Sequence, residues 1–185
     1  YELVEVFSTD TSYSKFTTSF TEVSSKELSK ISSFSSPNKV IAIFKMLAPS
    51  SVNWSGLVLA LDAINDPGNL GTIIRLCDWF GINDLVCSED TVDCYNSKVV
   101  QSSMGSHTRV NITYLKLEAV LVDSQSCYGT FMDGVSIYDQ KLPEIGVIVL
   151  GNEANGISKE MEDLMDTRLS IPRFGSLKQT ESLNV

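Results

Sequence analysis

The chain of 185 residues is 43% hydrophobic and 20% charged, and its formal net charge at pH 7 is −9. This length allows one hydrophobic core, or a core with a small added lobe, and the sequence has no run of about 18 apolar residues that would cross a membrane. Residues 1–56 carry five lysines and five acidic residues, so the whole net charge lies in residues 57–185. Proteins that bind nucleic acids usually carry a basic surface, so this charge argues against an RNA partner.

The cysteine pattern excludes a metal-binding knuckle. Cys77, Cys87, Cys94 and Cys127 form no C-x-x-C pair and are widely spaced, so we expect reduced thiols, no metal site and a cytoplasmic protein. Residues 1–7 alternate apolar and acidic side chains, unlike a signal peptide. A chain that begins with tyrosine is expected to lack its natural start.

The first segment is rich in hydroxyl side chains. Residues 8–36 contain sixteen Ser or Thr, a composition that would suit a disordered tail. Apolar residues are interleaved with them, however, and Ser24 with Glu27 fits a capping box for a helix at about 25–32. We therefore favour a folded segment over a tail.

A strand and a linker follow this helix. The stretch "PNKVIAIFK" predicts a buried strand at about 39–45. We interpret residues 1–45 as part of a small lobe whose front is missing. Residues 46–56, "MLAPSSVNWSG", have no periodicity and many Pro, Ser, Asn and Gly residues, so they are interpreted as a linker.

From residue 57 onward, apolar strands alternate with amphipathic helices. The expected strands lie at 57–62, 84–88, 110–115, 128–133, 147–151 and 168–172. The expected helices lie at 69–80, 96–103, 116–122 and 158–165. This alternation predicts an α/β domain with a mostly parallel sheet and helices on both faces. Such sheets bind ligands at the carboxyl ends of their strands, so the loops after residues 62, 132, 151 and 172 are the candidate site.

The first of these loops is "NDPGNLGTIIR", residues 65–75. Asn69 is a candidate N-cap, and Gly68 is a candidate for a positive φ. Arg75 falls off the apolar stripe, and Gly71, one turn below it, is expected to leave open space beneath the guanidinium. Two interpretations remain open: a capped helix with a solvated arginine, or an asparagine and an arginine that together bind an anion or phosphate.

The second loop is "VIVLGNEANGIS", residues 147–158. Ile157 and Ser158 stand where a P-loop would have Lys and Ser/Thr, and the G-x-G-x-x-G pattern is absent, so neither a nucleoside triphosphate nor a dinucleotide is indicated. Two glycines flank one carboxylate and two amides, which suits a neutral or cationic ligand. An ordinary turn between a strand and a helix would have the same pattern.

The third segment, "IPRFGSLKQTESLNV", spans residues 171–185. Thr180 is a candidate cap for a helix that begins at Glu181, and the sequence ends on the first turn of that helix. We therefore expect a further helix after Val185.

Together, the three segments resemble the three motifs of the SpoU/TrmH family, in the SPOUT class of RNA methyltransferases. "DAINDPGNLGTIIR" resembles the first motif, "VIVLGNEANGIS" the second and "IPRFGSLKQTESLNV" the third, in the family's order. The resemblance covers about residues 57–185, and residues 1–45 are similar to the latter part of the small RNA-binding lobe that often precedes the catalytic domain. It implies a C-terminal trefoil knot, a homodimer, and methyl transfer from S-adenosyl-L-methionine to a ribose 2′-hydroxyl of tRNA or rRNA.

The resemblance also assigns residues to roles. The family's catalytic positions correspond to Asn69, Arg75, Glu153, Ser182 and Asn184. Its cofactor-contacting positions correspond to Gly151, Ile171 and Leu183, with Thr130 and Asn152 as weaker candidates. The loop of residues 176–181 is longer than in many relatives, which puts the spacing to Leu183 in doubt.

The resemblance makes Arg75 the proton acceptor, but an arginine is a poor base at pH 7. We favour a clamp on the RNA phosphate that also stabilises developing oxyanion charge, with Asn69 and Ser182 positioning the hydroxyl. His107, the only histidine, lies outside the motifs and is expected to be structural.

The resemblance implies that this acidic chain binds RNA. A dimer interface is expected to gather Arg75, Arg109, Arg173 and Lys178 into one basic cleft, with acidic residues on the outside. The rival interpretations are a non-catalytic RNA-binding protein that keeps the fold, and a generic nucleotide-binding enzyme, for which a phosphate loop is lacking.

Overall fold

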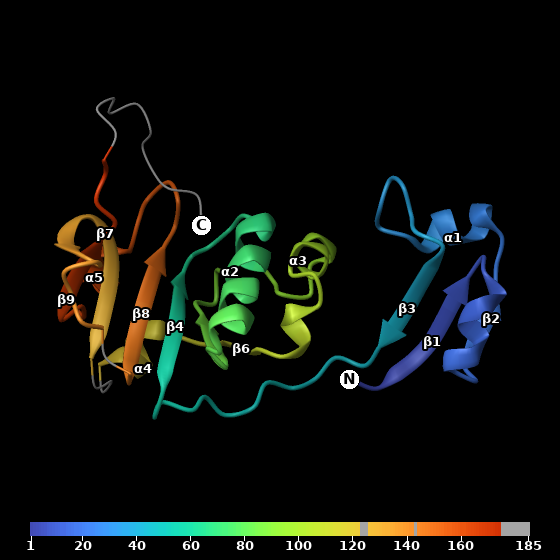
Figure 1. Cartoon of the computed structure of the whole chain (residues 1–185), viewed down its shortest axis with the longest axis horizontal. Helices are drawn as coiled ribbons and strands as arrows, with labels where there is room; N and C mark the ends of the chain where they lie inside the picture. Colours follow the sequence, from blue (N-terminus) through green and yellow to red (C-terminus); the bar gives the residue numbers. More distant parts are fainter. Residues whose placement is uncertain (123–125, 143, 175–185) are drawn as a thin grey trace. The chain divides into compact units, whose positions relative to one another are not determined.

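The computed structural model describes residues 1–174 except 123–125 and 143. Its internal contacts divide the chain into two compact units, Tyr1–Ala48 and Pro49–Val185 (Figure 1). No helix within the described ranges is both long and apolar enough to span a membrane.

The first unit is a three-stranded sheet with two short helices. Its strands β1 (Leu3–Ser8), β2 (Phe20–Glu22) and β3 (Val40–Phe44) lie in the order β2-β1-β3, with β1 parallel to β2 and antiparallel to β3. A 3₁₀ helix, η1 (Thr11–Phe16), connects β1 to β2, and α1 (Ser25–Ile31) follows β2.

The capping box of α1 is confirmed, but the burial of β3 is not. Ser24 Oγ accepts from the Glu27 N–H at 3.3 Å, and the Ser24 N–H donates to Glu27 Oε2 at 2.9 Å. The prediction of a buried strand at 39–45 was correct in place and wrong in burial, since Ile43 and Phe44 are 46% and 49% exposed. The reason is that β3 is an edge strand, paired only with β1 among the described strands.

The second unit is a six-stranded sheet in the order β6-β5-β4-β8-β7-β9, in which every neighbouring pair is parallel. Its strands are β4 (Leu57–Asp62), β5 (Asp84–Cys87), β6 (Asn111–Tyr114), β7 (Cys127–Ser136), β8 (Gly146–Gly151) and β9 (Thr167–Ser170). The helices are α2 (Pro67–Phe80), α3 (Ser97–Ser102), the 3₁₀ helix η2 (Ser106–Thr108), α4 (Leu117–Leu121) and α5 (Lys159–Glu162). The predicted α/β class with a parallel sheet is confirmed.

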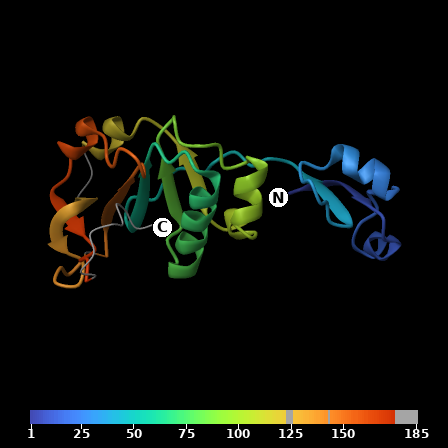
Figure 2. The ribbon, with the colours of Figure 1, turned by 90° about the horizontal axis from the view of Figure 1, so that it is seen from above.

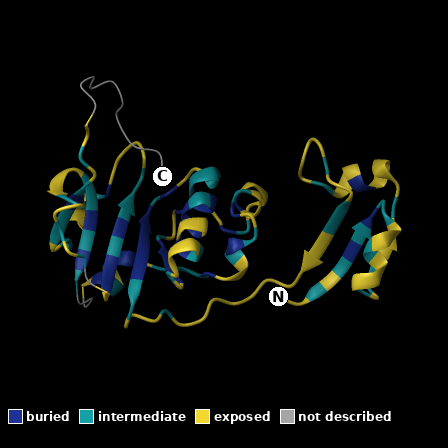
Figure 3. Ribbon diagram, in the orientation of Figure 1, coloured by how far each residue is buried: buried dark blue, intermediate teal, exposed yellow. Residues whose placement is uncertain are grey.

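Helices cover both faces of this sheet because successive side chains of a strand point to opposite faces. Leu59 and Leu61 of β4 pack into one core with α2 and α3. Val58 and Ala60 pack into a second core with α4 and α5. Figure 2 shows α2 on the opposite face of the sheet from α4 and α5, and in Figure 3 the central β4 is buried along most of its length.

The start of α2 differs from the prediction. Asp66, not Asn69, is the N-cap: its Oδ1 accepts from the Asn69 N–H at 2.9 Å, and Pro67 occupies the first turn. Proline suits that position because its fixed φ is helical and no N–H is needed there. Gly68 has no positive φ; that conformation belongs to Gly81, which ends the helix at φ 71°.

The expectation of open space at Gly71 is also wrong. Gly71 is buried against α3, where a Cβ would collide with Ser102 Oγ and lie 2.7 Å from Ser102 Cβ and 2.9 Å from its carbonyl carbon. Ser102 Oγ also donates to Pro67 O at 3.0 Å. Glycine at 71 therefore serves the close approach of α3 to α2.

We expect Gly71→Ala to lower the free energy of unfolding by about 1–2 kcal/mol, because overpacking costs about 1–3 kcal/mol and the higher helix propensity of alanine offsets part of it. Urea denaturation measures the change. The matched control is Gly56→Ala, where no atom lies within 4 Å of the added Cβ. Equal stability of the Gly71→Ala variant and the wild type would contradict this packing.

Candidate functional site

Two of the candidate loops leave the sheet side by side. Strands β4 and β8 are parallel neighbours, and their last residues, Asp62 and Gly151, are partners in the register (Figure 1). The loop that leads to Asn69 and the turn that carries Glu153 therefore start from adjacent points on the carboxyl edge. This is the edge where ligands of parallel sheets bind.

The turn after β8 is closed by its own backbone. The Asn152 N–H donates to Gly156 O at 2.9 Å, and the Gly156 N–H donates back to Asn152 O at 2.7 Å. Gly156 has a φ of 71°, which favours glycine. A Cβ on Gly151 would overlap the backbone of Gly156 and Ile157, so only glycine fits where the turn folds back. Glu153 lies exposed on this turn.

The side chain of Asn152 connects this turn to the loop after β4. Its Oδ1 accepts from the Ala154 N–H at 2.9 Å and from the Asn155 N–H at 3.3 Å, and its Nδ2 donates to Ala63 O at 2.6 Å. At the far end of the turn, the Ser158 N–H donates to Asp62 Oδ2 at 2.6 Å. The two candidate loops are thus hydrogen-bonded to each other at two points.

Ala63 itself has an unusual backbone. Its φ of 56° lies in the left-handed region, which a residue with a Cβ occupies at a cost. Its N–H donates to Ser88 Oγ at 2.9 Å, and its carbonyl accepts from Asn152. Side chains that follow β5 and β8 therefore hold this residue in place.

Arg75 differs from Arg109 and Arg168 in having no acidic partner among the described residues. It is exposed on α2 and forms no hydrogen bond or ion pair with any residue that the structure describes. Arg109, in contrast, binds Asp78 at 2.6 Å, which lowers the pKa of that carboxyl and raises the pKa of the guanidinium. Arg168 binds Asp133 and Glu162. Asp78 offsets the charge of Arg109 within the chain, and the place of Arg109 in a basic cleft of a dimer stays a prediction.

The other predicted catalytic residues divide into two groups. The side chains of Asn69 and Glu153 make no hydrogen bond within the described part of the chain, so both are available to a ligand. Ser182 and Asn184 lie outside the described residues, and their roles stay predictions.

The predicted cofactor residues lie near the same edge. Thr130 is on β7, next to β8, and its Oγ1 donates to Val149 O at 3.1 Å. Ile171 follows β9 and is 51% exposed. Gly151 ends β8, and Leu183 lies outside the described residues. The roles of these residues in cofactor binding stay predictions.

The sequence analysis missed three residues that build the site: Asp62, Asp66 and Ser88. Asp62 is only 7% exposed, and a carboxylate that ends an apolar strand was the signal for it. An aspartate directly before Pro67 was the signal for the cap. Nothing in the sequence around Ser88 indicates its bond to Ala63.

His107 and the cysteines lie apart from these loops. His107 is half-buried near the edge of the Tyr95 ring, with ring centroids 6.3 Å apart, and burial lowers its pKa. All four cysteines are free and buried, and burial raises the pKa of the Cys77 thiol to about 12. Among the described residues, no group of three His, Cys, Asp or Glu side chains is placed to hold a metal ion.

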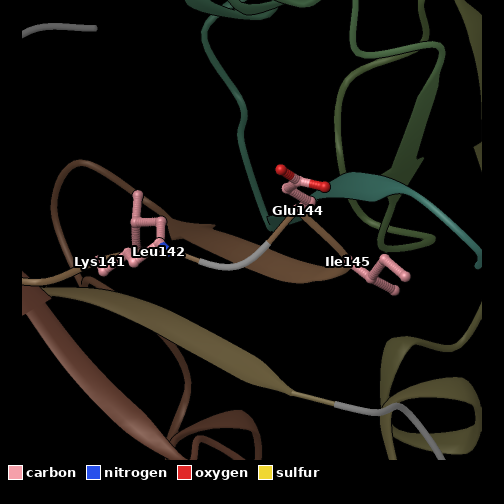
Figure 4. A pocket seen from close by; sticks show the side chains of 4 residues that line it. All are labelled: Lys141, Leu142, Glu144 and Ile145. Atoms are coloured by element: carbon pink, nitrogen blue, oxygen red, sulfur yellow. The ribbon is translucent and has the colours of Figure 1, made fainter.

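One surface hollow can be excluded as the site. It is lined by Lys141, Leu142, Glu144 and Ile145, in the segment that leads into β8 (Figure 4). These residues precede the amino end of β8, at the edge opposite the two candidate loops. The hollow therefore does not belong to the site.

Comparison with known proteins decides the family. Residues 56–185 match the sequence profile of the SpoU rRNA Methylase family. The chain belongs to this family. The resemblance that the three motifs carry is thereby confirmed.

Relatives of this SpoU family member include rRNA methyltransferases. The chain is 30% identical over 169 residues to the 23S rRNA (guanosine(2553)-2′-O)-methyltransferase RlmP of Bacillus subtilis, which covers 88% of this chain and 66% of that protein. It is 33% identical over 135 residues to the 23S rRNA (guanosine-2′-O-)-methyltransferase RlmB of Neisseria meningitidis, covering 70% and 53%. The chain thus spans between about half and two thirds of the length of these curated relatives.

Solved structures share the fold across the whole chain. A protein assigned to the TrmH family of RNA methyltransferases from Porphyromonas gingivalis is 33% identical, with a TM-score of 0.88 over 100% of this chain and 78% of that one. An AdoMet-bound rRNA methyltransferase from Sinorhizobium meliloti is 25% identical, with a TM-score of 0.81 over 99% and 75%.

The helix cap separates the structural role of Asp66 from the role of Asn69. We expect Asp66→Ala to lower the free energy of unfolding by about 1 kcal/mol, because the first turn of α2 loses its acceptor. Asn69→Ala should change stability by less than about 0.5 kcal/mol, because its side chain makes no contact that the fold needs. Urea denaturation of both variants tests this, and the reverse order of effects would restore Asn69 as the cap.

Proposed function

We propose that the protein is an RNA 2′-O-methyltransferase that uses S-adenosyl-L-methionine and acts on rRNA or tRNA. The observation that carries the proposal is the pair of hydrogen-bonded loops on one sheet edge, one leading from β4 to Asn69 and the other presenting the exposed Glu153 after β8. The relatives named above support it, since their names state 2′-O-methylation of 23S rRNA. The AdoMet-bound neighbour supports the cofactor.

The residues of the turn fit such a cofactor. S-adenosyl-L-methionine supplies a methyl group on a positively charged sulfonium. Glu153 is an exposed carboxylate without a partner among the described residues, which favours a cation, and the turn lacks the features of a phosphate loop. Gly151 is needed to form the turn itself, because a side chain there would overlap the backbone of Gly156 and Ile157.

Methyl transfer depends more on how the enzyme orients the ribose hydroxyl than on covalent catalysis. With the methyl donor bound, the ribose 2′-oxygen would form a bond to the methyl carbon as the carbon–sulfur bond breaks, S-adenosylhomocysteine would leave, and the hydroxyl proton would pass to water. Holding the hydroxyl in line can contribute about 7–11 kcal/mol to lowering the barrier. We assign this positioning to Asn69, whose side chain is free, and to Ser182.

Arg75 acts as a clamp in this proposal. An arginine stays protonated at any pH that proteins tolerate, so it is a poor proton acceptor. Its guanidinium can hold an RNA phosphate with two parallel hydrogen bonds and stabilise the charge that develops on the attacking oxygen. Because Arg109 is already paired with Asp78, few cations are left for RNA phosphates. Binding should therefore depend only weakly on salt, since the salt slope scales with the number of phosphates neutralised.

An exposed apolar face on α2 supports a homodimer. Leu76, Trp79 and Phe80 are 36%, 84% and 71% exposed, and their spacing of three and four residues places them on neighbouring positions of the helix surface. Large exposed apolar patches mark interaction sites. A second copy would cover this face beside Arg75, together with the helix that we expect to begin at Glu181.

Three further parts of the proposal rest on family membership. These are a trefoil knot in the C-terminal part, a role for residues 1–45 in binding RNA, and a location in the cytoplasm, where rRNA and tRNA are modified. The rival, a non-catalytic RNA-binding protein of this fold, is disfavoured because the unpaired side chains of Asn69, Arg75 and Glu153 serve no structural purpose within the described residues.

Arg75→Ala should lower the rate of methyl transfer by about 10²–10³-fold, the cost typical of a lost oxyanion donor. The fold and the affinity for S-adenosylmethionine should change little, because Arg75 is exposed and holds no described partner. Calorimetry of the wild type should show binding of S-adenosylmethionine and S-adenosylhomocysteine but not of ATP or NAD. Binding of ATP with no response to either adenosyl ligand would refute the proposed function.

The Arg75→Lys variant distinguishes the two possible roles of Arg75, a phosphate clamp and a proton acceptor. A bidentate clamp is poorly replaced by lysine, so activity should stay low across the pH range. A lysine that replaced a proton acceptor would recover activity as it deprotonates, and recovery to the wild-type rate above about pH 9 would show that Arg75 is a base.

Trp79→Glu should convert the dimer to a monomer at micromolar concentrations, because it places a charge in the centre of the apolar face. Light scattering measures the mass. Tyr138→Glu, which adds the same charge at a residue that is 69% exposed on the segment after β7, is the control and should stay dimeric. A monomeric wild type would contradict the homodimer.

A further inference from the structure

The turn that carries Glu153 is tied to the neighbouring loop at both of its ends. At the start, Asn152 Nδ2 donates to Ala63 O at 2.6 Å, and at the end, the Ser158 N–H donates to Asp62 Oδ2 at 2.6 Å. The positions joined are 89 and 96 residues apart in sequence. The turn therefore cannot move away from the β4 loop without breaking both bonds.

The residue that receives the first bond, Ala63, has a strained backbone. Ala63 adopts a φ of 56° directly after β4, where the chain changes direction toward α2. Such a conformation persists only when the surroundings hold it. Here the Ser88 hydroxyl holds its N–H and the Asn152 amide holds its carbonyl, so these two side chains fix the course of the loop that leads to Asn69.

The polar groups of Asn152 are used within the protein. Its Oδ1 accepts from two N–H groups of its own turn, and its Nδ2 donates to Ala63 O. A direct side-chain contact to a methyl donor would have to break one of these bonds.

We propose that Asn152 is a positioning residue: it holds Ala63 in its left-handed conformation and thereby aligns the loop of Asn69 with the turn of Glu153. In this role it affects the rate of methyl transfer without contacting the methyl donor, a statement that rests on the function proposed above. Ser88 performs the same task from the opposite side, through the N–H of Ala63.

Asn152→Asp tests the proposal. Aspartate keeps an acceptor for the Ala154 and Asn155 N–H groups but cannot donate to Ala63 O, so a carboxylate oxygen faces that carbonyl and this bond is lost, while the Ser158–Asp62 bond remains. The matched control is Asn83→Asp, which makes the same change at an exposed asparagine before β5. Thermal unfolding of both variants shows whether they are folded.

Two readouts are expected to move together. Amide hydrogen exchange of residues 62–70 should become at least tenfold faster in Asn152→Asp and should be unchanged in the control. The kcat for methyl transfer should fall at least tenfold, while the KM for S-adenosylmethionine should stay within about twofold of the wild type. Ser88→Ala, which leaves the turn after β8 intact, should show the same split between kcat and KM.

Each alternative outcome overturns the inference in a different way. A tenfold higher KM with an unchanged kcat in Asn152→Asp would show that Asn152 contacts the methyl donor. Unchanged hydrogen exchange in residues 62–70 would show that the bond does not hold the loop. If the wild type transfers no methyl group, the proposed function fails, and the exchange measurement still decides whether Asn152 holds Ala63. If Asn152→Asp does not fold, Ser88→Ala provides both readouts.

Discussion

The parallel pairing of β4 with β8 is the constraint on which the site depends. The two strands are paired over six residues, from Leu57 with Gly146 to Asp62 with Gly151. A slip by one residue would turn the buried side chains of β4 to the opposite faces of the sheet, so the packing of both cores fixes the register. That register is what brings the loop of Asn69 and the turn of Glu153 to one point of the carboxyl edge.

The negative net charge of the chain is compatible with RNA as a partner because the arginines differ in their ion pairing. Arg109 and Arg168 are bound by carboxylates within the second unit, where they stabilise contacts between α2 and η2 and between β7 and β9. Arg75, at the candidate site, is left without such a partner among the described residues. A single exposed cation in the right place can serve orientation and charge stabilisation, even where the rest of the surface gives RNA little attraction.

Much of the fold could be predicted from local patterns. Apolar runs with intervening amphipathic segments predicted the six strands and four α-helices described in the second unit, because both faces of a parallel sheet must be buried. The short 3₁₀ helix η2 was not predicted. The capping box of α1 was readable from Ser24 and Glu27 alone. The cap of α2 was missed because two good candidates stand three residues apart, and Pro67 decides between them.

Contacts between distant residues could not be predicted in this way. The space above Gly71 depends on where α3 packs, and the bonds of Asn152 to Ala63 and of Ser158 to Asp62 join segments that only the sheet order brings together. The three motifs indicated which residues belong to the site. They did not show that its two described loops are bound to each other.

The chemistry itself is tested most directly by locating the transferred methyl group. The protein would be incubated with rRNA and tRNA and with S-adenosylmethionine labelled on its methyl group, and the RNA would then be digested to nucleosides and separated. The expected result is label in a 2′-O-methylated nucleoside, which forms about 10²–10³-fold more slowly when Arg75 is replaced by alanine. Label on a base, or binding of the methyl donor with no transfer to either RNA, would contradict a 2′-O-methyltransferase.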